Sequence, residues 1–219
     1  VLHGRIKEGI VVTKHGYAGG DIAGFRVYEA GHPVPDADTY AATQAVIDMV
    51  EPLGGGDNVV FLLSGGGSAL FEKPLIQVED MERLTRELLA SGADIVEINT
   101  LRKRFSAVKG GRFAKLCAPA KVYAVVLSDV IGDRLDMIAS GPAAPDSSTA
   151  AEAKALAERY GLTLTERMTA LLDAETPKEL DNVETRITGS VTQLCLSAEK
   201  TCSTLGYKPF ILTSSLSCT

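Results

Sequence analysis

The 219-residue sequence contains no tryptophan, and aromatic residues make up only 5% of it. Proteins that stack single-stranded nucleic acid on aromatic side chains need more of them, so this class is disfavoured. A basic excess is also absent, because 28 acidic residues outnumber 22 basic residues and give a net charge of −6. We therefore expect no nucleic-acid partner.

Long apolar runs are missing as well. The runs at residues 59–63 and 122–127 hold five and six residues, whereas a helix needs roughly 20 to cross a bilayer. The chain also opens without the basic and apolar segments of a secretory signal. We therefore expect a cytoplasmic protein with no membrane partner.

Cysteine is scarce, and its four positions (Cys117, Cys195, Cys202 and Cys218) form no C-x-x-C pair. This spacing disfavours a zinc site, and a dense disulfide framework is unusual in a chain of this length. We interpret these residues as small buried hydrophobic side chains in a reducing compartment.

Secondary-structure patterns alternate along the chain. Short β-rich runs predict strands at residues 9–13, 25–30, 58–63, 121–128 and 209–213, with a weaker one at 186–188. Helical patterns occupy residues 38–50, 78–90, 148–160, 165–174 and 192–205. The two apolar runs do not alternate with polar residues, which is typical of parallel strands covered on both faces. We predict an α/β fold with a mostly parallel sheet, helices on both faces, and residues 58–63 and 121–127 as central strands.

A glycine-rich loop directly follows the strand at residues 58–63. It consists of Ser64, Gly65, Gly66, Gly67 and Ser68. Ligands of open α/β sheets bind beyond the carboxyl ends of the strands. Glycines let successive backbone N–H groups turn toward an anion, and the two hydroxyls add donors. The loop is a candidate phosphate or carboxylate site, and a tight turn is the alternative.

Three better-known motifs are absent. The sequence has no G-x-x-x-x-G-K-[ST], no G-x-G-x-x-G after a strand, and no complete nucleophile elbow. These absences disfavour a P-loop kinase, an ordinary dinucleotide-binding enzyme and an α/β-hydrolase.

Two acidic residues, Asp129 and Asp133, follow the strand at residues 121–127. Carboxylates at this edge suit a divalent cation or a general base. An Asp-rich turn or a helix cap is the alternative. A second Gly/Ser turn follows at residues 138–142.

Basic residues concentrate in one stretch of this acidic chain, which begins at Asn99 and contains Arg102, Lys103, Arg104, Lys109 and Arg112. Two interpretations remain open at this point. The residues form either a solvated helix face or a local positive site for an anionic ligand, with the Gly110–Gly111 pair opening the next helix toward it.

His32 lies in a loop that Pro33 and Pro35 stiffen, after the strand at residues 25–30. This placement makes His32 a candidate substrate contact, although a single loop histidine is more often structural. Asp36 or Asp38 is a candidate cap for the helix that follows.

Together these stretches resemble the type II glycerate kinases, or glycerate 2-kinases, whose members often carry the older name hydroxypyruvate reductase. The matching segments are GHPVPD at 31–36, LSGGGSAL at 63–70, NTLRK at 99–103 with KGG at 109–111, SDV at 128–130 with GD at 132–133, and IASGP at 138–142. The resemblance covers residues 10–206.

The resemblance implies ATP-dependent phosphoryl transfer to the 2-hydroxyl of D-glycerate, with Mg²⁺. It also implies two α/β domains with the site between them, of which the larger, N-terminal one is Rossmann-like. Residues 1–219 resemble most of that domain, so we expect one incomplete domain with a helical excursion at residues 147–184. The family carries an upstream lysine and a C-terminal domain that this chain lacks, so the isolated chain is expected to be inactive.

The resemblance also suggests a role for each candidate residue. These are Asp129, Lys103 and Lys109 for catalysis; Ser64, Gly65, Gly66, Gly67 and Ser68 for the nucleotide; His32, Asn99 and Arg102 for substrate; and Asp129 and Asp133 for the metal. Arg134 departs from the family pattern, which has a second acid there, and Phe105 and Val191 are further departures. The alternatives are an oxidoreductase acting on hydroxypyruvate and a non-catalytic anion- or nucleotide-binding fragment. A homo-oligomer is a further expectation.

Overall fold

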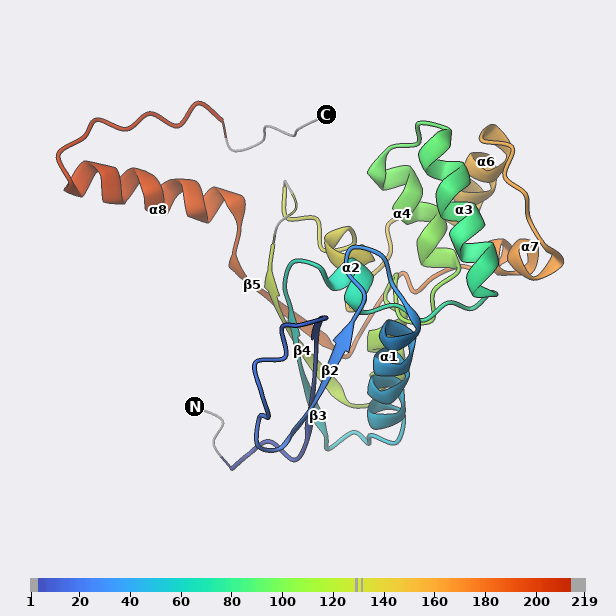
Figure 1. Ribbon diagram of the computed structural model, residues 1–219, viewed down its shortest axis with the longest axis horizontal. Coiled ribbons are helices and arrows are strands. Elements are labelled where there is room, and N and C mark those ends of the chain that lie inside the picture. Colours follow the sequence, from blue (N-terminus) through green and yellow to red (C-terminus); the bar gives the residue numbers. More distant parts are fainter. Residues whose placement is uncertain (1–3, 129, 131, 214–219) are drawn as a thin grey trace.

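The computed structural model describes residues 4–128, 130 and 132–213 (Figure 1). Its strands are β1 (Gly9–Lys14), β2 (Phe25–Ala30), β3 (Asn58–Leu63), β4 (Lys121–Leu127) and β5 (Val183–Gly189). Its helices are α1 (Ala37–Val50), α2 (Gly67–Leu70), α3 (Val78–Ala90), α4 (Ile95–Arg104), α5 (Arg112–Cys117), α6 (Ala150–Arg159), α7 (Glu166–Asp173) and α8 (Val191–Thr204), with a 3-10 turn η1 (Ile138–Ser140).

All strand pairs in the described chain are parallel, which confirms the α/β fold class. β1 pairs with β2, and a second sheet has the order β3-β4-β5. The prediction of a central strand is therefore right for β4. It is wrong for β3, which has a hydrogen-bonded neighbour on only one side among the described residues.

The predicted strand at residues 209–213 is also wrong, since these residues form no regular structure. A β-rich sequence becomes a strand only when a neighbour supplies ladder hydrogen bonds, and no pairing of this segment occurs in the described part of the chain. The weaker candidate at residues 186–188, by contrast, lies within β5.

One face of the three-stranded sheet packs on α1 and α5. The core there includes Val122 and Ala124 from β4 and three aromatic rings, those of Phe61, Phe71 and Phe113. The ring centroid of Phe61 lies 4.7 Å from that of Phe113, and the Phe71 centroid lies 5.2 Å from it. Aromatic contacts of this kind add to the stabilisation from buried area alone.

The opposite face of this sheet is apolar but exposed. Val60 and Leu62 of β3 are 50% and 73% exposed, and Tyr123 and Leu127 of β4 are also exposed. Within the described residues, helices therefore cover only one face of this sheet, whereas we expected both faces to be covered. α8 runs away from the sheet and buries none of its residues (Figure 1). None of the helices in the described part combines the length and the apolar character that crossing a membrane requires.

Four helices form a second core beside the sheet. α3, α4, α6 and α7 bury a cluster that includes Leu84, Leu101, Phe105, Ala153 and Met168 (Figure 1). The predicted helical excursion at residues 147–184 supplies α6 and α7 to this layer and then enters β5. The segment is thus an integral part of the second core.

Polar side chains fix the start of the helices that matter for the site. The Asp36 carboxylate accepts from the Thr39 backbone N–H at the start of α1, Asp94 caps α4, and Thr149 caps α6. Each cap satisfies backbone N–H groups that the first turn leaves without a partner.

We predict that Phe113→Ala lowers the free energy of unfolding by about 3–5 kcal/mol, because it leaves a cavity between two aromatic neighbours. Chemical denaturation measures this change. Phe210→Ala is the matched control, since that ring is 83% exposed, and it should leave the unfolding midpoint unchanged. Equal midpoints for the two variants would contradict the assignment of Phe113 to the core.

Candidate functional site

Segments from three of the four predicted stretches meet beyond the carboxyl end of β3, namely the glycine-rich loop, the loop of His32 and the turn at residues 138–142. A Cβ placed on Gly66 would lie 3.1 Å from the imidazole of His32. One placed on Gly67 would lie 3.1 Å from the Cβ of Ala139. The glycine-rich loop therefore lies between the loop of His32 and the turn at residues 138–142. Asp129, which precedes that turn in the same stretch, lies outside the described residues.

The glycine-rich loop turns sharply out of β3. The Gly67 N–H donates to the Ser64 carbonyl at 3.3 Å, and Gly66 has φ +86°, a conformation that favours glycine. Within the described chain, the backbone N–H groups of Gly65 and Gly66 have no acceptor. Ser64 and Gly65 are exposed. The loop therefore offers two adjacent backbone donors to an anion in solution.

The turn after η1 holds three consecutive residues in the left-handed region. Ala139, Ser140 and Gly141 have φ of 50°, 60° and 65°, and the two non-glycine residues each cost about 1–3 kcal/mol in such a conformation. Four contacts hold the turn, namely Lys109 Nζ to the Ala139 carbonyl (3.2 Å), the Gly110 N–H to Ser140 (2.9 Å), the Gly111 N–H to Gly141 (2.7 Å) and Ser140 Oγ to Asn99 Oδ1 (3.0 Å). Asn99 is thus buried in a structural contact.

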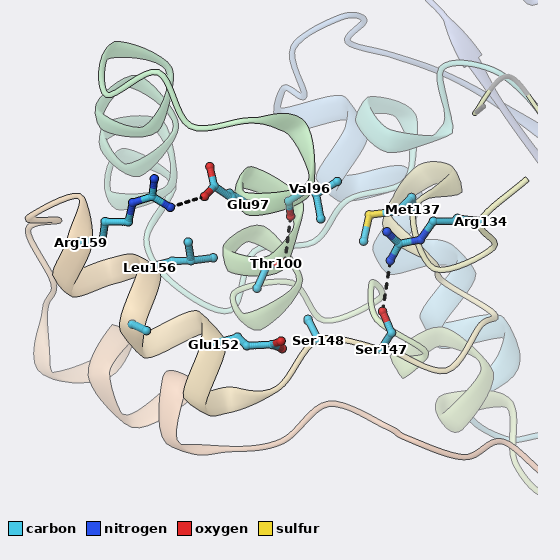
Figure 2. A pocket seen from close by; sticks show the side chains of 11 residues that line it. Val96, Glu97, Thr100, Arg134, Met137, Ser147, Ser148, Glu152, Leu156 and Arg159 are labelled. Carbon is cyan, nitrogen blue, oxygen red and sulfur yellow. Dashed lines mark hydrogen bonds and ion pairs between the residues drawn. The ribbon is translucent and has the colours of Figure 1, made fainter. Parts of the chain in front are cut away.

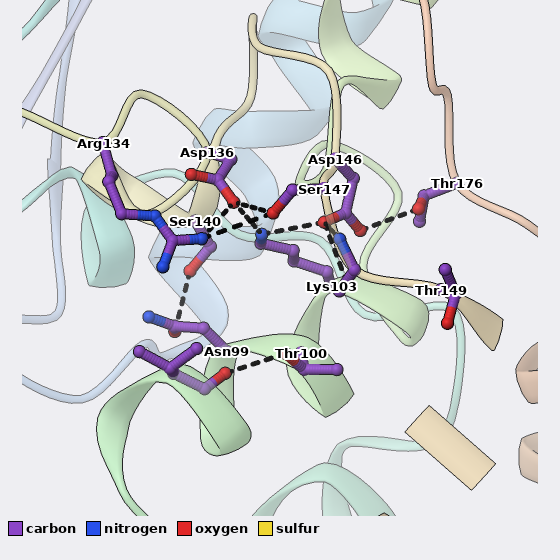
Figure 3. Close-up of polar contacts among 12 residues, drawn as sticks. Asn99, Thr100, Lys103, Arg134, Asp136, Ser140, Asp146, Ser147, Thr149 and Thr176 are labelled. Atoms are coloured by element: carbon purple, nitrogen blue, oxygen red, sulfur yellow. Dashed lines mark hydrogen bonds and ion pairs between the residues drawn. The ribbon is translucent and has the colours of Figure 1, made fainter. Parts of the chain in front are cut away.

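Lys103, expected to act in catalysis, is fully buried in an ion-pair network (Figure 3). Its Nζ lies 3.0 Å from Asp146 Oδ1 and 3.6 Å from Asp136 Oδ2. Burial alone would raise the pKa of Asp146, but the Thr176 hydroxyl at 2.7 Å and the Lys103 charge lower it below the ordinary value. Lys103 therefore links α4 to the segment at residues 136–148.

Lys109, the other lysine expected to act in catalysis, is also fully buried. Its Nζ donates to the carbonyls of Ser68 (2.9 Å), Phe71 (3.2 Å) and Ala139 (3.2 Å). Burial lowers its pKa to about 8. In the structure the ammonium groups of both lysines have protein partners and no exposed surface, so a catalytic role for either one stays a prediction.

The rest of the basic stretch is also largely interior. Arg104 is fully buried and donates to the Ala174 and Ser148 carbonyls, and Arg112 donates to the Ser106 carbonyl. Neither a solvated helix face nor an open positive patch describes this stretch. Its cations bind other parts of the chain instead.

Arg102 is the exception, because its side chain keeps 18% of its surface exposed. Its terminal Nη2 lies 3.6 Å from Oε2 of the buried Glu72. The Arg102 Nε is buried and finds no hydrogen-bond partner among the described residues. The part of Arg102 that remains accessible is therefore not its unpaired Nε.

The described residues provide one of the two predicted metal ligands. Asp133 is half-buried, has φ +51°, and its N–H donates to the Val130 carbonyl at 3.1 Å. Mg²⁺ often binds proteins through one or two carboxylates together with substrate phosphates. Asp133 suits that donor set.

A group that sequence reasoning missed lies beside α1. His15 Nε2 is 2.8 Å from Asp36 and 3.8 Å from Asp38, so in the described chain these three side chains could share a cation. The hydrogen bond that the Asp36 carboxylate accepts from His15 raises the pKa of His15. No motif marks this group, because His15 follows β1 whereas Asp36 caps α1 and Asp38 lies in its first turn.

A cavity of about 440 Å³ lies between α4, α6 and the segment around Arg134 (Figure 2). Its lining includes Thr100, Arg134, Ser147, Glu152 and Arg159. Arg134 also joins the Lys103 network through Asp136 and Ser147. The residues that line this cavity form no sequence motif. The one signal in the sequence was that Thr100 directly follows Asn99, a predicted site residue.

Comparison with known proteins assigns the family. The model of a family described as a domain of unknown function, DUF4147, matches residues 1–173. The chain belongs to the DUF4147 family. This result and the relatives below confirm the resemblance to glycerate 2-kinases that the four motifs predicted.

Among relatives of this DUF4147 chain, D-glycerate 2-kinase of Thermotoga maritima is 51% identical over 220 residues, covering 100% of this chain and 53% of the relative. The crystal structure of glycerate kinase from Thermotoga maritima superposes with a TM-score of 0.92 at 51% identity, covering 97% of this chain and 52% of that one. A relative from Agrobacterium vitis that carries a hydroxypyruvate reductase name is 45% identical over 177 residues, or 78% of this chain and 40% of its own. The chain spans about half the length of such relatives.

We predict that Asp146→Asn lowers the free energy of unfolding by about 3–5 kcal/mol near neutral pH, because it leaves Lys103 buried with a weaker partner. The folded-state pKa of Asp146 is lowered, so its stabilisation is present above the unfolded pKa and is lost as pH falls through the folded value. When the pH falls below about 4, the free energy of unfolding should therefore decrease less for the variant than for the wild type.

Urea denaturation at neutral and acidic pH measures both effects, and the exposed Asp181→Asn is the control. An Asp146→Asn variant as stable as this control at neutral pH would contradict the network.

Proposed function

We propose that this chain is one incomplete α/β domain, residues 1–219, of a two-domain glycerate 2-kinase that transfers a phosphoryl group from ATP to the 2-hydroxyl of D-glycerate with Mg²⁺. The observation that carries the proposal is the convergence of the glycine-rich loop, the His32 loop and the turn at residues 138–142. The 51% identity to D-glycerate 2-kinase of Thermotoga maritima over the whole chain supports it.

Within this proposal the glycine-rich loop binds phosphate. The backbone N–H groups of Gly65 and Gly66 and the hydroxyls of Ser64 and Ser68 are the donors, with Gly67 closing the turn. Backbone donors of this kind bind anions without a charged side chain. Arg102 and His32 then bind the glycerate carboxylate, and the 18% of the Arg102 side-chain surface that is exposed is where this contact would form.

Asp133 would hold Mg²⁺ together with the nucleotide phosphates, and the resemblance adds Asp129, which lies outside the described residues. Bound Mg²⁺ would neutralise phosphate charge, which is the chief requirement of phosphoryl transfer. The protein's own contribution is to position the two substrates and to exclude water. Lys103, Lys109 and Asn99 contribute from the interior, by holding the loops that carry the ligand contacts.

Catalysis is expected to need more than residues 1–219. Kinase sites close around both substrates. Each charge contact with the transferred group can lower the activation free energy by several kcal/mol. The longer relatives supply about as many further residues as this chain contains. We therefore expect residues 1–219 to bind phosphate-like anions weakly and to turn over no glycerate.

A hydroxypyruvate reductase is the alternative enzyme, because two relatives from Agrobacterium vitis carry that name. The sequence lacks the G-x-G-x-x-G fingerprint after a strand, which disfavours dinucleotide binding. NADH oxidation with hydroxypyruvate would restore this alternative. The remaining alternative, a non-catalytic anion-binding fragment, predicts binding without turnover in any longer form.

We place this activity in the cytoplasm, where the three described cysteines would remain the free thiols seen here. D-glycerate and the nucleotide are the proposed partners, and a homo-oligomer remains an expectation.

An ATP-coupled assay with D-glycerate and Mg²⁺ tests the kinase proposal. It compares residues 1–219, the same chain extended to the length of its relatives, and the Thermotoga maritima enzyme. The extended chain should phosphorylate glycerate and residues 1–219 alone should not. An inactive extended chain beside an active Thermotoga maritima enzyme would contradict the proposal.

We predict that Gly66→Ala weakens binding of Mg·ATP by about tenfold or more, because a Cβ there meets His32 and strains a left-handed backbone by about 1–3 kcal/mol. Calorimetric titration measures the affinity. Gly55→Ala is the matched control, because nothing lies within 4 Å of a Cβ at that position. Equal affinities for the two variants would remove the loop from the nucleotide site.

A further inference from the structure

The Lys109 ammonium joins two segments that are far apart in the sequence. The carbonyls of Ser68 and Phe71 belong to the segment that continues the glycine-rich loop through α2. The Ala139 carbonyl belongs to the strained turn. An ammonium group has three N–H donors, so these three carbonyls use all of its hydrogen-bonding capacity.

The two buried lysines differ in how their charge is compensated. Lys103 lies within 3.6 Å of two carboxylates, at Asp146 and Asp136. Lys109 pairs with one carboxylate among the described residues, that of Glu72 at 3.8 Å, and Glu72 also lies 3.6 Å from Arg102. One carboxylate thus faces two cations, which leaves a net positive charge directly behind the glycine-rich loop.

We propose that Lys109 is a positioning residue for the anion site, which locks residues 64–71 to the turn at residues 139–141 and maintains a positive charge behind the loop. The inference rests on the proposed function and deepens it. Lys109 acts through the loop, because its side chain has no exposed surface that a ligand could contact. This role replaces the catalytic one that the sequence suggested.

Anion affinity should consequently depend on pH. The charged side chains that act on Lys109 are Glu72, which raises its pKa, and Arg102, which lowers it, while the turn contributes only a carbonyl. Burial dominates and brings the pKa to about 8. A neutral amine has two N–H groups for three carbonyls, so deprotonation leaves one carbonyl without a donor, weakens the link between the segments and also removes the charge. Affinity therefore falls as pH rises through about 8.

Sulfate is a suitable probe, because its charge does not change in this pH range. We expect calorimetric titration of the 219-residue chain with sulfate to show affinity falling about tenfold between about pH 7 and about pH 9.5. Lys109→Met should show the weaker affinity already at pH 7 and no dependence on pH. Lys115→Met, which removes an exposed lysine of α5, should behave as the wild type.

Hydrogen exchange provides a second measurement. Backbone amides of residues 66–71 and 139–141 should exchange faster in Lys109→Met, relative to the amides of α3, because both segments lose a shared partner. If Lys109→Met does not fold, exchange at residues 66–71 and 139–141 relative to α3 is compared in the wild type below and above pH 8. Faster relative exchange above pH 8 is then the expected result. A general loosening would instead accelerate α3 as well.

Several outcomes would overturn the inference. These are a wild-type affinity that does not change with pH, a folded Lys109→Met with the affinity of Lys115→Met, unchanged exchange at both segments, or no sulfate binding. None of these measurements involves glycerate turnover. A failed kinase assay beside the expected sulfate results would therefore contradict the proposed function and leave the role of Lys109 in place.

Discussion

The structure around the site depends on the burial of positive charge. Lys103, Arg104 and Lys109 have no exposed surface, and moving a cation out of water costs several kcal/mol unless partners compensate it. The partners come from residues 68–71, 136–148 and 174–175. Each of these segments is therefore constrained to pass close to the basic stretch. The loops at the carboxyl end of β3 take their positions from this constraint.

The same stretch also joins the two hydrophobic cores. Leu101 and Phe105 belong to the helical cluster, whereas Val108 and Phe113 belong to the core beneath the sheet. The buried cations lie between these anchors along the chain. A rearrangement of the helical layer would thus alter the loops of the site through the residues that hold them. The two cores are coupled because residues 101–113 are one continuous segment, as well as through the contacts that this segment makes.

Much of the local structure could be predicted from the sequence. The bounds of β2, β3 and α3 match the pattern of residues 25–30, 58–63 and 78–90, because hydrophobic periodicity and flanking turn residues determine such elements locally. The convergence of the glycine-rich loop with the His32 loop was also predicted, from the rule that ligand-binding loops follow the carboxyl ends of parallel strands. The two loops nevertheless follow strands of different sheets, β3 and β2.

The partners of the buried cations could not be predicted. A run of basic residues has the same sequence pattern whether it is solvated or buried, and Asp136, Asp146 and Thr176 carry no signal of their own. The exposed face of the three-stranded sheet was unpredictable for a related reason. Val60 and Leu62 are apolar enough to be covered, but what covers them depends on segments far from the strand. The individual ligand roles remain predictions.

The sequence separation of the contacts made by Lys109 has a consequence for how the chain folds. Its partners lie 30 to 41 residues away, and those of Lys103 and Arg104 lie up to 71 away. Closing such loops loses more chain entropy than forming α3 or α4, whose contacts are local. We expect the helices to form early and the contacts of the buried cations to form late. The glycine-rich loop would then acquire its final shape only when residues 139–141 have been synthesised and have docked on Lys109.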